Sequence, residues 1–309
     1  MNMINKFIKL SILMALVSTA FLFSSAVNAS CDKDADGKII TVSGNSTTPV
    51  KDGGTAGDQC SDIPDEYHLG FFKLGLCTDD PSNLDYSSCE FMYNSSTALE
   101  HTIAYPVAAP LDMPDFTIPP GTYGYMLAIL NGKLGLKNTI ETTNTTTGKT
   151  ATGTTCWTIT GMTGVSNQVI VTPHGTTLAG GVQVIECGDT AAPVVSYEII
   201  NVLADEAEDG CNTMGAQGDK DADQAVENGI AVAALLQATD TSYATACTNA
   251  SKLLWSIALT SPVKVTPTST FNLRFKLTDA VSVDFSSSSD TKILKMGADP
   301  IQALLTVSN

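Results

Sequence analysis

Near its C-terminus the chain reads FNLRFKL over residues 271–277 and VSVDF over residues 281–285, with TDA at residues 278–280 between them. Apolar and polar side chains alternate in both runs, and this period of two is the pattern of a strand with one buried face. Because a short polar break joins the two runs, they are predicted to pair as a hairpin. The stretch therefore favours a protein built from antiparallel strands.

The rest of the chain indicates the same fold class. It is rich in Thr, Ser, Gly and Asn, and turn residues recur at short intervals. Threonine and the β-branched aliphatic residues favour pleated surfaces. We therefore expect a mainly β protein, arranged as antiparallel β-sandwiches stapled by disulfides. Further strands are expected at residues 67–77, 123–130, 157–160, 169–172, 181–187, 194–203, 253–260, 292–295 and 300–307.

Two segments allow more than one structure. Residues 141–155 are mostly Thr, Asn, Gly and Ala, which predicts a mobile surface loop or the tip of a hairpin. Residues 222–238 hold an apolar run, and a helix capped by Asp221 or Asp223 is one interpretation. A buried strand over residues 229–236 is the other, because the run has no polar face.

The chain also contains a short internal echo. Residues 119–123 and 267–271 both read Pro-x-x-Thr-aromatic before an alternating stretch. This echo leads to the hypothesis of two related sandwich units, at residues 66–190 and 191–309, after an acidic N-terminal segment at residues 30–65. The alternative is that proline and threonine before a strand are common turn chemistry.

Residues 116–123 read FTIPPGTY. This run resembles the strand-opening motif of transthyretin-like and collagen-adhesin B-type sandwich repeats in secreted bacterial proteins. The physical sense of the motif is that prolines fix a turn, glycine permits a positive φ, and the aromatic residue enters the core. The resemblance implies a sandwich fold.

The first residues have the features of an export signal. Lys6 and Lys9 precede an apolar run at residues 10–23, and VNA at residues 27–29 supplies small residues for cleavage. We expect a signal peptide over residues 1–29, no transmembrane anchor after its removal, and an extracytoplasmic location: secreted, periplasmic or cell-surface. The alternative is an uncleaved membrane anchor. About 280 residues follow, which suits one large or two ordinary domains.

The chain has eight cysteines, all beyond the expected signal. An even number in an exported protein indicates four disulfides. Sequence alone does not fix the pairing, and the short separation of Cys77 and Cys89 makes theirs the strongest prediction. The sequential set is Cys31–Cys60, Cys77–Cys89, Cys156–Cys187 and Cys211–Cys247.

The formal net charge is −16, and removal of Lys6 and Lys9 with the signal takes it to −18. A surface this acidic repels phosphate backbones, so no nucleic-acid partner is expected. Arg274 is the single arginine, which excludes an arginine cluster for phosphate or carboxylate recognition. Cation binding is the natural consequence of such a charge.

The sharpest motif is DKDADGKI at residues 32–39, which matches the start of a calcium loop. Asp32, Asp34 and Asp36 place carboxylates at loop positions one, three and five. Gly37 supplies the sharp turn at position six, and Lys38 would offer its backbone carbonyl at position seven. The motif predicts a structural calcium ion, and the alternative is a solvated acidic segment.

The calcium motif has one departure and one weaker repeat. Ser43 occupies loop position twelve, where a bidentate Glu is expected. The repeat consists of Asp219, Asp221 and Asp223, which share the carboxylate spacing. Gln224 replaces the turn glycine, so a plain acidic loop is the favoured interpretation of this second candidate.

Enzyme signatures are missing from the sequence, and no catalytic residue is predicted. His68, His101 and His174 are isolated from one another, and no nucleophile elbow or zinc-hydrolase spacing occurs. Trp157 and Trp255 are expected in the core. The sequence favours an exported structural or surface-interaction protein of adhesion or assembly type, with other proteins or surface glycans as partners. The alternatives are a secreted carbohydrate-binding module and an extracytoplasmic hydrolase whose site is built from separated loops.

Overall fold

The structure of the protein is a computed structural model. It describes residues 30–41, 50–51, 55–56, 59–105, 111, 113–148, 150–159, 162–163, 185–200, 220–226, 228–246, 249–285, 294–298 and 301–308. These residues form nineteen strands and one turn of 3-10 helix, η1 (Pro81–Asn83), and they contain no α-helix. No helix in this part of the chain is long and apolar enough to cross a membrane. The expected signal at residues 1–29 lies outside the described residues.

The largest sheet has nine strands. They are β4 (Glu66–Cys77), β5 (Cys89–Ala104), β6 (Gly121–Asn131), β7 (Lys133–Lys137), β10 (Met162–Thr163), β12 (Ser196–Ile199), β13 (Lys220–Val226), β14 (Gly229–Leu236) and β15 (Lys252–Val265). Its neighbouring strands are antiparallel, apart from the short parallel pair of β10 with β12.

Four smaller antiparallel sheets complete the described fold. They are β11 (Ile185–Gly188) with β9 (Thr152–Thr158) and β8 (Thr139–Thr147); β18 (Leu294–Ala298) with β17 (Val281–Phe285) and β3 (Gln59–Asp62); β16 (Thr270–Lys276) with β19 (Gln302–Ser308); and β1 (Val50–Lys51) with β2 (Thr55–Ala56). The predicted fold class, mainly β with antiparallel sheets in a sandwich-like arrangement, is confirmed.

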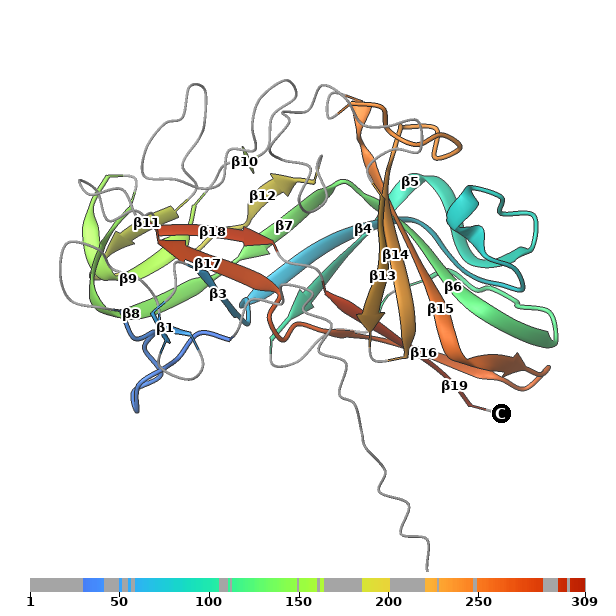
Figure 1. Ribbon diagram of the computed structural model, residues 1–309, viewed down its shortest axis with the longest axis horizontal. Coiled ribbons are helices and arrows are strands. Elements are labelled where there is room, and N and C mark those ends of the chain that lie inside the picture. The colour runs from blue at the N-terminus through green and yellow to red at the C-terminus, as the bar shows by residue number, and fades with distance from the viewer. Residues whose placement is uncertain are drawn as a thin grey trace, which may run out of the picture.

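Strand β4 is the common element of the large sheet. It pairs with β5 on one side, and its other side is shared between β7, at the start of β4, and β6 further along. Strand β6 continues the sheet to β15, and β7 continues it to β12. In Figure 1, β4 runs between the end of the molecule that holds β8, β9 and β11 and the end that holds β6 and β15.

The sheet divides at Gly132, between β6 and β7. The Gly132 backbone N–H donates to Ser251 O at 2.9 Å, and its carbonyl accepts from Ile200 N at 2.7 Å. A Cβ atom at this position would lie 2.9 Å from the Ser251 carbonyl oxygen. Glycine is therefore required for one residue to contact both branches of the sheet.

The main core lies on one face of the large sheet. Tyr67, Leu69 and Phe71 alternate along β4, and all three belong to one cluster of buried side chains. The ring of Phe275 on β16 lies 5.9 Å from that of Phe71. The smaller sheets contribute further buried members of the cluster, which are Val281, Val283, Met296, Ala303 and Leu305. This face-to-face burial is what makes the arrangement a sandwich.

A second cluster lies on the opposite face, near the Cys77–Cys89 disulfide. Its buried aliphatic members include Leu127, Leu236 and Leu254. Leu84 and Tyr86, which follow η1, and Tyr243, from the segment between β14 and β15, pack against these residues. Both faces of the sheet are therefore covered at this end.

The hairpin predicted for residues 271–285 is wrong, although both strands exist. Strand β16 pairs with β19, and β17 pairs with β18 and β3. A turn does occur between them, with Asp279 at a φ of 63°. The two strands leave the turn for different sheets because partners distant in sequence complete their ladders. Period-two alternation shows that one face of a strand is buried, but it does not identify the strand with which it pairs.

The two ambiguous segments both form strands. Residues 141–155 contribute to the hairpin of β8 and β9, which confirms the hairpin alternative. Thr142 and Thr146 are nevertheless fully buried there, because their hydroxyls donate to backbone carbonyls of the same hairpin. Residues 229–236 form β14, as the strand alternative predicted. The strand expected at residues 169–172 lies outside the described residues.

The nine-stranded sheet takes strands from both predicted sandwich units. Strands β4 to β7 come from residues 66–190, and β12 to β15 come from residues 191–309. The division of the chain at residue 191 stays a prediction.

Three of the four predicted disulfides are present: Cys31–Cys60, Cys77–Cys89 and Cys156–Cys187. The second and third each join residues that face one another in adjacent strands. Cys211 and Cys247 lie outside the described residues, so their pairing stays a prediction. Disulfides persist in oxidising compartments, and these three indicate an extracytoplasmic environment.

His101 on β5 makes the stability of the fold depend on pH. Its side chain is buried, and its ring lies 5.9 Å from that of Phe275. Burial lowers the pKa of His101 below its ordinary 6.5. His101 therefore binds a proton more tightly in the unfolded chain than in the folded one. As the pH falls below 6.5, protonation favours the unfolded chain, and the free energy of unfolding decreases.

We predict that His101→Leu removes this contribution. In urea unfolding between about pH 7.5 and pH 5, the wild-type protein should lose more stability than the variant, because only the wild type must bury or discharge an imidazolium. Parallel stability curves for the two proteins would contradict the prediction.

Candidate functional site

The first predicted calcium motif forms a tight hairpin. The backbone N–H of Asp34 donates to Lys38 O at 2.9 Å, and that of Gly37 donates to Asp34 O at 3.0 Å. Gly37 has a φ of 82°, which confirms the predicted sharp turn. The Asp34 carboxylate accepts from the backbone N–H groups of Asp36 and Lys38. The Lys38 carbonyl, predicted as a ligand, thus already accepts a hydrogen bond within the hairpin.

Calcium binding at the two candidate loops stays a prediction. Within the described ranges, no group of three or more His, Cys, Asp or Glu is placed to hold a metal ion. Ser43 and Asp219 lie outside the described residues. Asp221 and Asp223 lie on β13, whose pairing with β14 shifts register between Asp221 and Gln224. Two of the three carboxylates of the second candidate thus lie on a strand with a register shift, and the site itself stays a prediction.

One charged cluster, the Lys–Asp–Lys clamp, consists of Lys73 on β4, Lys252 on β15 and Asp240 in the segment between β14 and β15. Lys73 Nζ lies 3.4 Å from Asp240 Oδ1, and Lys252 Nζ lies 3.1 Å from Asp240 Oδ2. The side chains are 16%, 12% and 11% exposed respectively. Asp240 is therefore buried and the two lysine side chains are partly buried.

Aromatic rings surround the clamp. Lys73 Nζ lies 4.7 Å from the centroid of Tyr86, and Lys252 Nζ lies 4.2 Å from that of Phe72. The Tyr86 hydroxyl donates to Asp240 O at 3.0 Å. Burial, with the nearby Asp240 charge, raises the pKa of Tyr86 far above its ordinary 10.0, so the hydroxyl remains a donor. These contacts fasten the Asp240 segment to the sheet, which is a structural role.

A second polar cluster, the Glu–His–Thr row, consists of Glu66 and His68 on β4 and Thr102 on β5. His68 Nε2 lies 3.1 Å from Glu66 Oε2, and Thr102 Oγ1 lies 3.0 Å from His68 Nδ1. Lys137 on β7 donates to Glu66 Oε1 at 2.6 Å. The side chains of Glu66 and His68 are 26% and 20% exposed, so solvent reaches the row.

Strand register explains why Thr102 meets His68. Tyr105 N donates to Asp65 O at 2.9 Å, which makes that pair a hydrogen-bonded one. Pairs alternate along an antiparallel ladder, so Thr102 and His68, which face one another, form a pair without backbone bonds. Side chains approach most closely in such pairs, and Glu66 lies on the same face as His68 because it is two residues away.

The charges and hydrogen bonds around the row decide which of its groups carry a proton. The hydrogen bond from Lys137 holds the pKa of Glu66 below its ordinary 4.5 against the effect of burial, and the bond from His68 acts in the same direction. Ionised Glu66 can only accept a hydrogen bond, so in the neutral form of His68 the proton lies on Nε2. In that form His68 Nδ1 accepts from the Thr102 hydroxyl.

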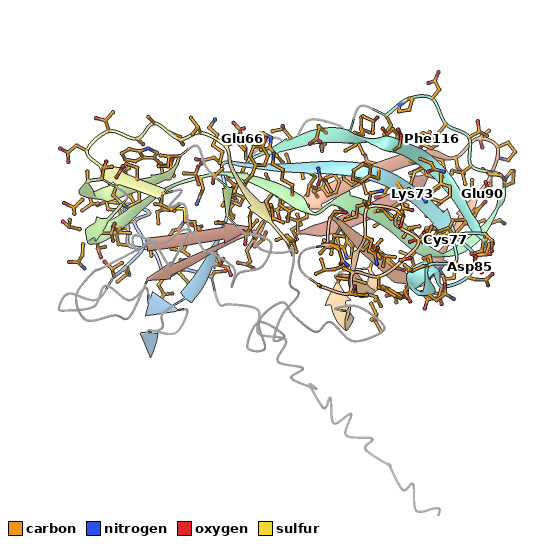
Figure 2. All side chains as sticks on the ribbon, turned by 90° about the horizontal axis from the view of Figure 1, so that it is seen from above. Glu66, Lys73, Cys77, Asp85, Glu90 and Phe116 are labelled. Atoms are coloured by element: carbon orange, nitrogen blue, oxygen red, sulfur yellow. A yellow bond between two sulfur atoms is a disulfide. The ribbon has the colours of Figure 1, made fainter. Side chains whose placement is uncertain are left out.

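The two clusters occupy different parts of the sheet. Figure 2 shows Glu66 near the middle of the molecule, whereas Lys73 and Cys77 lie toward one end. Sequence analysis missed both clusters because their members come from distant parts of the chain. The one local signal was the two-residue spacing of Glu66 and His68, which puts both on one face of β4, although the predicted strand began one residue after Glu66.

The motif at residues 116–123 opens β6 as the sequence predicts. Tyr123 is buried, and its hydroxyl donates to Pro119 O at 2.8 Å. Comparison with known proteins supplies no family, because no protein-family model, curated protein or solved structure matches the chain. Function must therefore be argued from residues and contacts.

We predict that Asp240→Ala lowers the free energy of unfolding by about 1–3 kcal/mol, because it leaves two partly buried ammonium groups without a counter-charge. The triple variant Lys73→Met/Asp240→Leu/Lys252→Met should recover most of this loss, since it removes all three charges at similar volume. Urea denaturation measures both. An Asp240→Ala protein as stable as the wild type would contradict the structural role.

Proposed function

We propose that the chain is an exported structural module that joins another extracytoplasmic protein through an edge of its nine-stranded sheet. The proposal rests on the outer edge of β5, which is the edge that does not pair with β4. This strand has 16 residues, and in the described part of the chain it pairs with β4 alone. An unpaired strand edge is a template for a strand from another protein.

The usable edge is the C-terminal half of β5. Residues 99–104 pair with residues 66–71 without interruption, whereas the register then jumps to Asn94 opposite Lys73. The bond from Tyr105 N to Asp65 O sets the alternation, so the N–H groups of Glu100, Thr102 and Ala104 point away from β4. This stretch has six regularly paired residues, and three of them have backbone N–H donors that point outward. It therefore suits the addition of one extended segment from a partner.

Other features support a partner outside the cytoplasm. The three disulfides indicate an oxidising compartment. The net charge of −16 disfavours association between copies and favours a partner segment that is neutral or basic. Trp157 is buried, and Trp255 is partly buried against the main core, which disfavours a sugar-stacking role for either ring. The edge is thus a better supported contact than a glycan platform.

We also propose that residues 32–38 bind calcium as a structural ion. Isothermal titration of the mature protein with calcium should give binding heat that Asp34→Ala/Asp36→Ala abolishes, because it removes two of three carboxylates. Asp79→Ala/Asp85→Ala, an equal charge change near η1, should retain the heat. Equal heats in all three proteins would remove the proposed ion.

The edge proposal predicts that Ala104→Pro abolishes saturable binding of labelled mature protein to cells of the source organism. Proline removes an outward N–H while sparing the ladder with β4. Ser96→Pro, in the part of β5 that faces no β4 residue, is the matched control and should bind like the wild type. Undiminished binding by Ala104→Pro, with the control intact, would overturn the proposal.

A further inference from the structure

We infer that the Glu–His–Thr row is a nucleophilic site, in which the Thr102 hydroxyl attacks carboxylic esters. This activity is independent of the edge contact proposed above. A nucleophile within hydrogen-bond reach of a base, with the base oriented by a third group, is the arrangement that activates a hydroxyl. Here the two distances are 3.0 Å and 3.1 Å.

The hydrogen bonds of the row run in the direction that such a site needs, from the Thr102 hydroxyl through His68 to Glu66. Lys137 keeps Glu66 ionised, and Glu66 holds the proton on His68 Nε2. In the neutral form of His68, Nδ1 accepts from the Thr102 hydroxyl and is the group placed to take its proton.

The ring of Tyr197 forms a flat surface beside the row. A Cβ atom at Gly135 would lie 2.8 Å from His68 Cβ and 2.9 Å from Tyr197 Cε1, so the tyrosine ring leans over the glycine toward His68. Lys133 Nζ lies 3.9 Å from the centroid of that ring. A planar group stacks well beside such a surface. We therefore assign small uncharged esters with a planar group as the substrate class.

The reaction balances without a cofactor. Thr102 Oγ1 bonds to the ester carbonyl carbon while its proton passes to His68 Nδ1. The carbon–oxygen bond to the alcohol then breaks, and the alcohol leaves with that proton. Water attacks the acyl-threonine, again giving its proton to His68 Nδ1, and the carboxylic acid departs as the proton returns to Thr102. Glu66 is a positioning residue, which stabilises the imidazolium at each step.

The test uses p-nitrophenyl acetate with the mature protein, followed by peptide mapping by mass spectrometry. We expect a burst of p-nitrophenol and acetylation of Thr102. Thr102→Ser should keep the burst, whereas Thr102→Val should abolish it, and His68→Gln should slow it by roughly 100-fold or more. Thr97→Val, at an exposed threonine of the same strand, is the matched control and should behave as the wild type.

A split between binding and chemistry separates positioning from folding. Glu66→Gln should lower the rate of Thr102 acetylation at saturating ester, with little change in the ester concentration that gives half of that rate, because the amide stabilises the imidazolium less than the carboxylate does. An unchanged rate would overturn the role of Glu66. Acetyl groups found only on lysines, or a Thr102 label no greater than that of Thr97 in the wild-type protein, would overturn the site itself, and this readout requires no variant to fold.

Discussion

The pairing of β4 with three other strands is the constraint on which the rest of the structure depends. Its one side is occupied by β5, and its other side passes from β7 to β6. Both branches of the large sheet are thus built on the same twelve residues. Its apolar residues, Tyr67, Leu69 and Phe71, supply the core beneath the smaller sheets. If β4 left the sheet, both branches would lose their common partner.

The same strand also positions the polar groups. Its first half carries Glu66 and His68 on the face opposite to the core. A bulge between Phe71 and Lys73 then interrupts the alternation, so that Phe72 and Lys73 both serve the second face. Bulges commonly redirect side chains in this way. The irregularity therefore lets one strand supply two residues of the hydrogen-bonded row near its start and one lysine of the ionic clamp further along.

Local chemistry made part of this architecture predictable from sequence. Alternation identified strands, as at residues 271–277, because a buried face requires it whatever the partner. The separation of Cys77 and Cys89 favoured their bridge, since short loops bring neighbouring strands together. Pairing between distant strands was not predictable, as the wrong hairpin at residues 271–285 demonstrates. The two polar clusters were missed for the same reason. Nothing in the sequence distinguishes Thr102 from the other threonines, and only the strand register places it opposite His68.

Native-state hydrogen exchange can show whether β4 unites both branches of the sheet in one cooperative unit. Protected amides in β4, β6, β7, β12 and β15 should exchange with one common free energy, equal to that of global unfolding. Exchange of β7 and β12 as a separate unit, at a lower free energy than β6 and β15, would contradict it.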